Sequence, residues 1–409
     1  MTSVVPSSAA QSSYANPKNV ILFYDDYPTR GDPNFQITRE IATPLVAHLD
    51  KTGMPTGWMF DSFIFFSIYL YSDRKPTHAY IDAWISFLFD GNQISNLDST
   101  VAECKASLNE PDYQVNVLLA VPAELKSDNY HLNETYTVDE NDILNNLNTL
   151  LNRWNALNPR NLRLTGFYWG FTENPTEVVG YGTTIPKIAD FIHSKGLKLM
   201  LIPFLKTYSF DFIHGLGFDL STMQPNYAWF ANPSLDMFAK VNSAISSHYA
   251  DGAEFEIPVP PLESTTCCGG NWSINQQTYL DQAYSFGWNR NTVNSYYHGS
   301  TISFMGRASD PRIRQGYDKI YQFIKSTKAT LSVIRSASLN AIITGSDIPS
   351  SMVAGKAYSV HVAIRNTGTT TWTATSKLIR VGLNSPFQPA DVGLDSAVSV
   401  SPGQEYTLT

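Results

Sequence analysis

The chain has 409 residues, more than one ordinary domain needs, and its 43% hydrophobic and 16% charged residues are typical of a globular protein. The formal net charge is −8 and no run of Lys and Arg occurs, which argues against nucleic acid as a partner. The longest apolar stretch, residues 58–70, is interrupted by Asp61 and is too short to span a bilayer. The 22 Tyr, 22 Phe and 8 Trp residues suit either a large core or the stacking of sugar rings.

Residues 1–18 are polar and rich in small side chains, and they lack the basic and apolar regions of a signal peptide. We expect them to form a disordered leader. The three cysteines, Cys104, Cys267 and Cys268, have no spacing that resembles a zinc site. The sequence therefore predicts no metal and no organic cofactor, and it leaves the oligomeric state open.

Strand-like and helix-like segments alternate through residues 19–328, and several strand-like segments are continuous apolar runs, as expected for strands buried on both faces. Eight such units favour a (β/α)8 barrel, although a doubly wound sheet would alternate in a similar way. Residues 279–297 have helical periodicity and are expected to form one of the helices. The expected strands are residues 19–24, 57–67, 115–121, 162–171, 198–204, 217–224, 251–257 and 301–306.

The composition changes after this region. Residues 329–338 are expected to form a linker, and residues 339–409 contain short strand-like segments rich in Thr, Val, Ser and Gly. Residues 358–364 alternate clearly, and a turn at residues 366–368 precedes Trp372. This pattern predicts an Ig-like β-sandwich, here incomplete, because about 100 residues make a full one.

Function in such a barrel resides at the C-terminal ends of the strands, where this sequence places carboxylates, amides and aromatic side chains. Glu173 follows the fourth strand, and Glu254 and Glu256 lie on the seventh. Hydrolysis of a glycosidic bond needs two carboxyl groups, one donating a proton to the leaving oxygen and the other attacking the anomeric carbon or activating water. Further candidates for binding the substrate are Asp25, Asp26, Tyr168, Trp169, Gln224, Asn226 and Tyr227.

The seventh strand offers two glutamates that point to the same face, since Glu254 and Glu256 are two residues apart. We expect both to face the barrel interior, with Phe255 directed toward the helices. Glu256 lies nearer the strand end and is the preferred nucleophile, whereas Glu254 would tune it or bind a hydroxyl group. An ordinary alternative is a buried salt bridge to an arginine such as Arg163 or Arg290.

Two segments, GFYWGFTENP (residues 166–175) and DGAEFEIP (residues 251–258), resemble the fourth-strand and seventh-strand signatures of an uncharacterised microbial family. NVILFYDDYP and GFDLSTMQPNY fit the same family. The resemblance implies a glycoside-hydrolase-like (β/α)8 barrel, often followed by Ig-like modules, but it names no substrate. The Asn that usually precedes the fourth-strand acid is replaced by Thr172, so the amide either comes from elsewhere or is not needed.

We therefore expect a glycoside hydrolase that cleaves a polysaccharide or glycan, with retention preferred, outside the cell or at its surface. Glu173 is the expected acid/base and Glu256 the expected nucleophile. The alternative from another class is a non-catalytic glycan-binding or cell-surface scaffold protein built on the same barrel. A metal-dependent hydrolase is the third hypothesis, and the sequence offers it no His-rich set of ligands.

Overall fold

The computed structural model describes residues 17–25, 36–67, 70, 76–126, 136–205, 212–229, 234–257 and 272–326 of the first unit. In the second unit it describes residues 341–347, 349, 356, 358–366, 370–373, 377–379, 391–395 and 398–408. The two compact units are residues 1–327 and 328–409. Nearly all of the expected leader, residues 1–16, lies outside the described residues, as do Asp26, Cys267 and Cys268.

The first unit is a closed barrel of parallel strands, which confirms the (β/α)8 interpretation over a doubly wound sheet. The barrel closes where β1 pairs with both β4 and β12. In order around the barrel the strands are β1 (Asn19–Tyr24), β12 (Val293–Tyr297), β11 (Gly252–Glu256), β10 (Leu220–Met223), β9 (Lys198–Leu201), β8 (Leu162–Tyr168), β5 (Val115–Ala120) and β4 (Ser62–Phe66).

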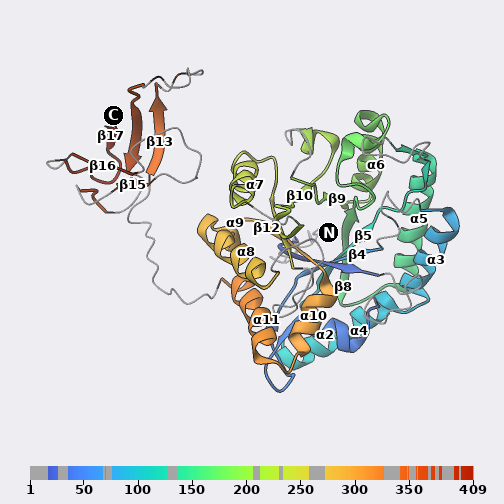
Figure 1. Cartoon of the computed structure of the whole chain (residues 1–409). Helices are drawn as coiled ribbons and strands as arrows, with labels where there is room; N and C mark the ends of the chain where they lie inside the picture. The colour runs from blue at the N-terminus through green and yellow to red at the C-terminus, as the bar shows by residue number, and fades with distance from the viewer. Residues whose placement is uncertain are drawn as a thin grey trace, which may run out of the picture. The chain divides into compact units, whose positions relative to one another are not determined.

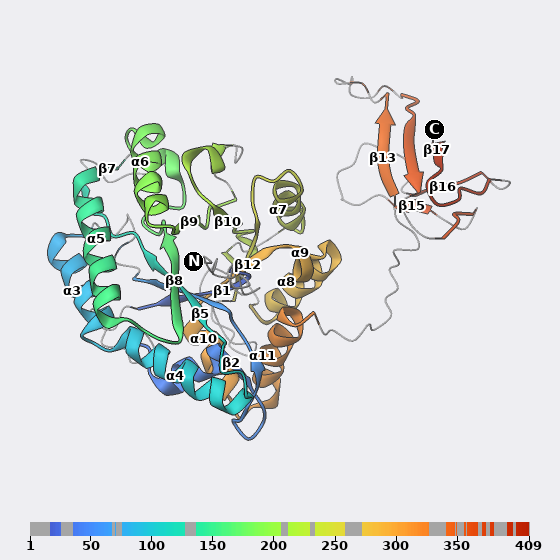
Figure 2. The ribbon, with the colours of Figure 1, turned by 180° about the vertical axis from the view of Figure 1, so that it is seen from behind.

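Helices surround these strands, as Figures 1 and 2 show from opposite sides. The crossover between β9 and β10 is the exception, since its described part holds only the short 3-10 helix η6 (His214–Leu216). No helix in the described part of the chain has the length and apolar character needed to cross a bilayer. The helices are α2 (Arg39–Val46), α3 (His78–Phe89), α4 (Gln93–Leu108), α5 (Glu140–Leu157), α6 (Tyr181–Ser194), α7 (Asp236–Ser246), α8 (Trp272–Phe286), α9 (Trp288–Asn291), α10 (Gly299–Arg307) and α11 (Pro311–Ile324).

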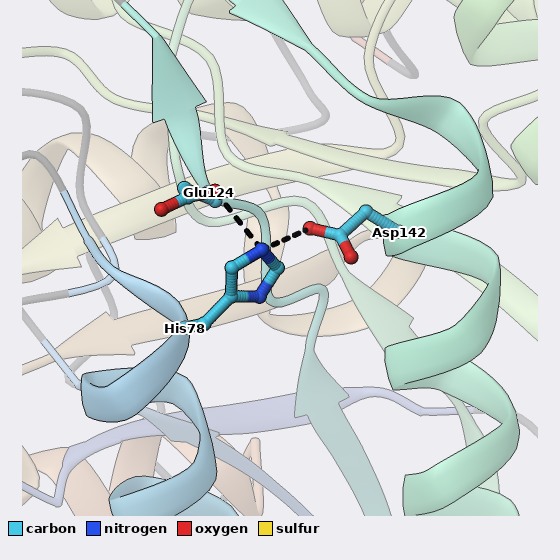
Figure 3. A group of neighbouring side chains, drawn as sticks. All are labelled: His78, Glu124 and Asp142. Carbon is cyan, nitrogen blue, oxygen red and sulfur yellow. Dashed lines mark ion pairs between the residues drawn. The ribbon is translucent and has the colours of Figure 1, made fainter.

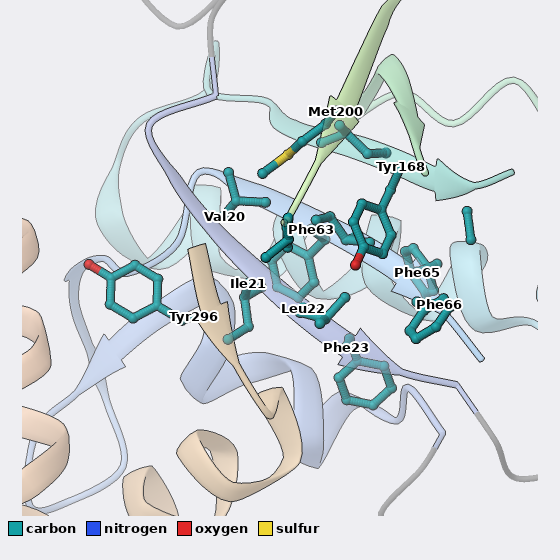
Figure 4. Packing of buried hydrophobic residues seen from close by; sticks show 14 of the residues in the cluster. Val20, Ile21, Leu22, Phe23, Phe63, Phe65, Phe66, Tyr168, Met200 and Tyr296 are labelled. Carbon is teal, nitrogen blue, oxygen red and sulfur yellow. The ribbon is translucent and has the colours of Figure 1, made fainter. Parts of the chain in front are cut away.

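The first strand shows why apolar runs build this barrel. In β1, Val20, Ile21, Leu22 and Phe23 are all buried, because one face of the strand meets the barrel interior and the other meets the helices. Ile21 and Phe23 lie against α10 at Gly299. Figure 4 shows these side chains packed with those of β4, β8, β9 and β12 in one continuous core.

The eighth strand was assigned wrongly from the sequence. Residues 301–306 belong to α10, and the expected helix over residues 279–297 ends at Asn291 and gives way to β12. The sequence of β12, VNSYY, lacks an apolar run, yet Asn294 and Ser295 are buried. Asn294 donates a hydrogen bond to the carbonyl oxygen of Trp288 at 3.0 Å, so its burial is compensated by a local contact that composition does not reveal.

Backbone and side chains approach closely at the start of β11. Gly252 opens β11, and a β-carbon there would lie 1.5 Å from the carbonyl oxygen of Val293 on β12. Nearby, the hydroxyl groups of Thr222 on β10 and Ser295 on β12 are hydrogen-bonded at 2.7 Å across β11. Gly252 therefore permits β10, β11 and β12 to approach closely just before Glu254 and Glu256.

The second unit contains antiparallel strands around a small core of its own. One sheet has the order β13 (Ala341–Ser346), β14 (Val362–Asn366) and β17 (Glu405–Leu408), and a second pairs β15 (Lys377–Ile379) with β16 (Asp391–Gly393). Ile364, Trp372, Val400 and Leu408 form the buried cluster. The Ig-like assignment remains a prediction. The short antiparallel strands are compatible with it.

We predict that Gly252→Ala destabilises the barrel unit by more than about 2 kcal/mol, because the methyl group would collide with backbone that cannot move without breaking the β11–β12 pairing. Gly182→Ala is the matched control. Gly182 lies in α6 with open space around it, so alanine should stabilise the helix by about 0.5–1 kcal/mol. Urea denaturation of both variants measures the difference, and equal stabilities would contradict the packing argument.

Candidate active site

The three glutamates lie at the C-terminal end of the barrel. Glu254 and Glu256 are both buried on β11, and the intervening Phe255 packs on Tyr296 and Phe323 on the helix side. This alternation agrees with the expected orientation of the strand. Glu173 follows β8 and is partly buried. The charge of Glu173 raises the pKa of Glu254, so the carboxyl group that follows β8 and those on β11 belong to one site.

A chain of hydrogen bonds connects Glu173 to Glu256 through two amides that follow β10. The side chain of Gln224 donates to Glu173. Asn226 Nδ2 donates to Gln224 Oε1 at 3.2 Å and to Glu256 Oε1 at 3.4 Å. On the far side, the hydroxyl group of Tyr279 on α8 donates to Glu256 Oε2. Two predicted binding residues, Gln224 and Asn226, thus become the physical connection between the two predicted catalytic ones.

The backbone holds this chain in place. Asn226 has a φ of 57°, in the left-handed region that Asn adopts more readily than most residues. In this conformation its Oδ1 accepts a hydrogen bond from the backbone N–H of Leu205 at 3.0 Å. Gln224 Nε2 also donates to the carbonyl oxygen of Ile202 at 3.3 Å. Both amides are therefore oriented by the backbone after β9.

The three carboxyl groups differ in their environments. Burial raises the pKa of Glu173 to about 7, against a favourable hydrogen bond from Gln224. Burial, and then the charges of Glu256 and Glu173, raise the pKa of Glu254 well above its usual range. Glu256 accepts two hydrogen bonds from side chains, which stabilise a carboxylate. The arrangement favours a protonated Glu254 and a Glu173 that can exchange its proton near neutral pH.

Aromatic side chains flank the carboxyl groups. Tyr297, the last residue of β12, is hydrogen-bonded to Tyr24 at the end of β1. Burial raises the pKa of Tyr297 to about 12, and all three glutamates contribute to the increase. The Tyr24 ring also lies 5.6 Å from the ring of His298. Tyr168 meets Phe66 edge to face at 5.6 Å and lies close enough to raise the pKa of Tyr24.

The remaining predicted binding residues have other environments. Trp169 is completely buried and packs on Phe171 and Phe218, so it has no free face for a sugar ring. Tyr227 is 9% exposed and packs against Tyr279, which makes it a support for the donor to Glu256. Asp25 directly follows β1 and its side chain is buried.

The two arginines considered as salt-bridge partners lie at the opposite end of the barrel. Arg163 is the second residue of β8 and donates to Gln114 Oε1 at 3.1 Å. Arg290 precedes β12 and lines a cavity of about 710 Å³ at the N-terminal ends of the strands, together with Lys18 and Asp61. A salt bridge to either arginine therefore does not explain the burial of Glu254 and Glu256.

Sequence reasoning missed three side chains of this site: Tyr279, Tyr297 and His298. The helical periodicity of residues 279–297 conceals β12, and with it the positions of Tyr297 and His298 at a strand end. Tyr279 projects from a helix and carries no signal in the sequence, since its role depends on how α8 packs on β11.

The fold and the carboxyl groups define a (β/α)8 barrel protein with an acidic site at the C-terminal ends of its strands. Residues 19–322 match the family DUF4855, a domain of unknown function, and the chain belongs to this family. The resemblance to an uncharacterised family is thereby confirmed. No curated protein matches the sequence.

Solved structures that resemble the chain do so distantly. A mutant tryptophan synthase α-subunit from Pyrococcus furiosus has 9% identity and a TM-score of 0.37, covering 76% of this chain and 98% of its own. SrfJ from Salmonella typhimurium has 9% identity and a TM-score of 0.41, covering 96% of this chain and 88% of its own. Likeness at this level carries no argument about function.

We predict that Glu173→Gln becomes more stable than the wild type as the pH rises. Above about pH 4.5 the unfolded chain ionises Glu173, whereas the folded protein keeps the proton up to about pH 7, so the wild type loses stability across this window. Glutamine has no proton to lose, and its advantage should reach roughly 1–3 kcal/mol at pH 8 and vanish at pH 4.5.

Urea denaturation at pH 4.5, 6 and 8 measures this difference. Glu103→Gln, which changes an exposed carboxyl group on α4, is the matched control and should show little dependence of this kind. A Glu173→Gln advantage that is the same at all three pH values would show that the Glu173 carboxyl group is not held in its neutral form.

Proposed function

We propose that this protein is a glycoside hydrolase that cleaves a glycan with two carboxyl groups and retention of anomeric configuration. The observation that carries the proposal is the hydrogen-bonded chain from Glu173 through Gln224 and Asn226 to Glu256, in which burial raises the pKa of Glu173 to about 7 and two donors stabilise the carboxylate form of Glu256. A two-carboxyl mechanism needs this asymmetry, because one group must give a proton while the other is already ionised.

In the first step, Glu173 donates its proton to the glycosidic oxygen while a Glu256 carboxylate oxygen attacks the anomeric carbon. The bond to the leaving group breaks, and a glycosyl ester of Glu256 forms. In the second step, the Glu173 carboxylate takes a proton from water, whose oxygen attacks the same carbon and releases Glu256. Each attack inverts the anomeric centre, so the net outcome is retention.

The neighbouring side chains have roles in this scheme. Asn226 and Tyr279 orient Glu256, and Gln224 supplies beside Glu173 an amide that Thr172 cannot provide. Glu254, kept neutral by burial and by the charge of Glu256, can donate a hydrogen bond without adding a negative charge beside the nucleophile. Tyr24 and Tyr297 give an aromatic and hydroxyl-bearing wall against which a sugar can lie.

Turnover of a glycan panel tests the proposal. On a substrate that the wild type cleaves, Glu173→Gln and Glu256→Gln should each lower turnover by more than about a hundredfold, because each removes a reacting group. In the wild type, turnover should decline as the pH rises through about 7, where Glu173 loses its proton. NMR should show that the first product has the same anomeric configuration as the cleaved bond of the substrate.

Wild-type turnover in both variants would overturn the assignment of the two residues. Glycan binding without turnover of any substrate by the wild type would favour the non-catalytic alternative, a glycan-binding or scaffold protein. An inverted anomer as the first product would exclude the covalent intermediate on Glu256.

The hydroxyl group of Tyr279 provides a finer test. Tyr279→Phe removes one donor to Glu256 and should lower kcat about 10–100-fold while the protein remains folded. Tyr296→Phe is the matched control, since the Tyr296 hydroxyl group is also buried but donates to Asn19 Oδ1 at 3.2 Å, on the other side of β12. Its kcat should stay close to that of the wild type. Equal losses of kcat would mean that Tyr279 acts only through general packing.

A further inference from the structure

A second group of chemically competent side chains lies apart from the glutamate site, where three separate elements meet. His78 is the first residue of α3, Glu124 follows β5, and Asp142 lies in the first turn of α5. Figure 3 shows the two carboxyl groups on either side of the same edge of the imidazole ring. We refer to these residues as the His78 cluster.

Both carboxyl groups approach one ring nitrogen. His78 Nε2 lies 3.0 Å from Glu124 Oε2 and 3.2 Å from Asp142 Oδ2. A protonated Nε2 carries a single hydrogen, which can point along only one of these two directions. A cation in place of that hydrogen can contact both carboxylates and the nitrogen lone pair at once.

The spacing also suits a coordination sphere. Two donors that each lie about 2.1 Å from a metal ion are roughly 3.0 Å apart at an octahedral angle and roughly 3.4 Å apart at a tetrahedral angle. The two nitrogen–oxygen distances, 3.0 and 3.2 Å, fall within this interval. All three donor atoms lie within 4.8 Å of one another. The side chains of Glu124 and Asp142 are partly exposed, so they can rotate to bring their carboxylate oxygens closer together.

The local charge favours a cation. Glu124 and Asp142 carry two negative charges, and in the described part of the chain neither forms an ion pair with a lysine or an arginine. Lys187 on α6 pairs with Glu140, which precedes Asp142 by two residues on α5, at 3.1 Å. The side chain of His78 is 53% exposed, so an ion from solution can reach Nε2.

We propose that the His78 cluster binds one divalent transition-metal ion of the zinc type, with solvent completing its coordination. One imidazole and two carboxylates form a donor set that zinc accepts, whereas calcium and magnesium prefer oxygen ligands alone. The ion would join the start of α3, the segment after β5 and the start of α5. It would therefore hold these three segments together at the C-terminal end of β5.

Zinc titration of the full-length protein without a histidine tag tests this proposal. By isothermal titration calorimetry at pH 7.5, the wild type should bind one equivalent of Zn²⁺ more than His78→Ala does. Glu124→Gln and Asp142→Asn should each weaken this binding by about tenfold or more, since each replaces a charged ligand by a neutral amide. Saturating Zn²⁺ should raise the Tm of the wild type by roughly 2–5 °C, and EDTA should reverse the change.

His193→Ala is the matched control. His193 Nε2 contacts a single carboxylate, that of Asp219 at 2.8 Å, so its loss should leave the zinc stoichiometry unchanged. The same stoichiometry and the same Tm shift in the wild type, His78→Ala and Glu124→Gln would overturn the proposal and identify the cluster as an ion pair only. Preferential binding of Ca²⁺ at these residues would overturn the assignment to a transition metal.

Discussion

The site depends on one electrostatic constraint, which is that three carboxyl groups enclosed in the mouth of a barrel cannot all be ionised. Burial and the charges of Glu256 and Glu173 hold the proton on Glu254, and burial brings the pKa of Glu173 to about 7. Glu256 differs from both because Asn226 and Tyr279 donate to its oxygens. Among the described residues, hydrogen-bond donors rather than positively charged side chains therefore distinguish the three carboxyl groups.

Barrel closure makes this arrangement available. The amides follow β10, the glutamates lie on β11 and after β8, and the tyrosines end β1 and β12, so the site draws on five of the eight barrel strands. Gly252 and the hydroxyl pair of Thr222 and Ser295 set the spacing of β10, β11 and β12 below the glutamates. Local packing below the site thus fixes the relative positions of the β11 glutamates and of the amides that follow β10.

The sequence predicted those features that depend on local patterns and failed where burial depends on a distant partner. β1 was predicted with the observed bounds, because five of its six residues are buried and four of these form the apolar run VILF. β12 was missed because its Asn294 and Ser295 are buried through hydrogen bonds to Trp288 and Thr222. Glu173, Gln224, Asn226 and the β11 glutamates were found by their positions at strand ends. Tyr279 and the His78 cluster were not, because only the packing of helices brings them to their partners.

Glu254 has a consequence for how such a chain changes over evolutionary time. Its carboxyl group is buried, and Oε1 has no hydrogen-bond partner among the described residues. An apolar or amide side chain of similar size would satisfy this position better, so drift under selection for stability alone should remove the acid. Members of this fold that have given up their chemistry should therefore be recognisable by the loss of buried acids at the barrel mouth, before any change in the barrel itself.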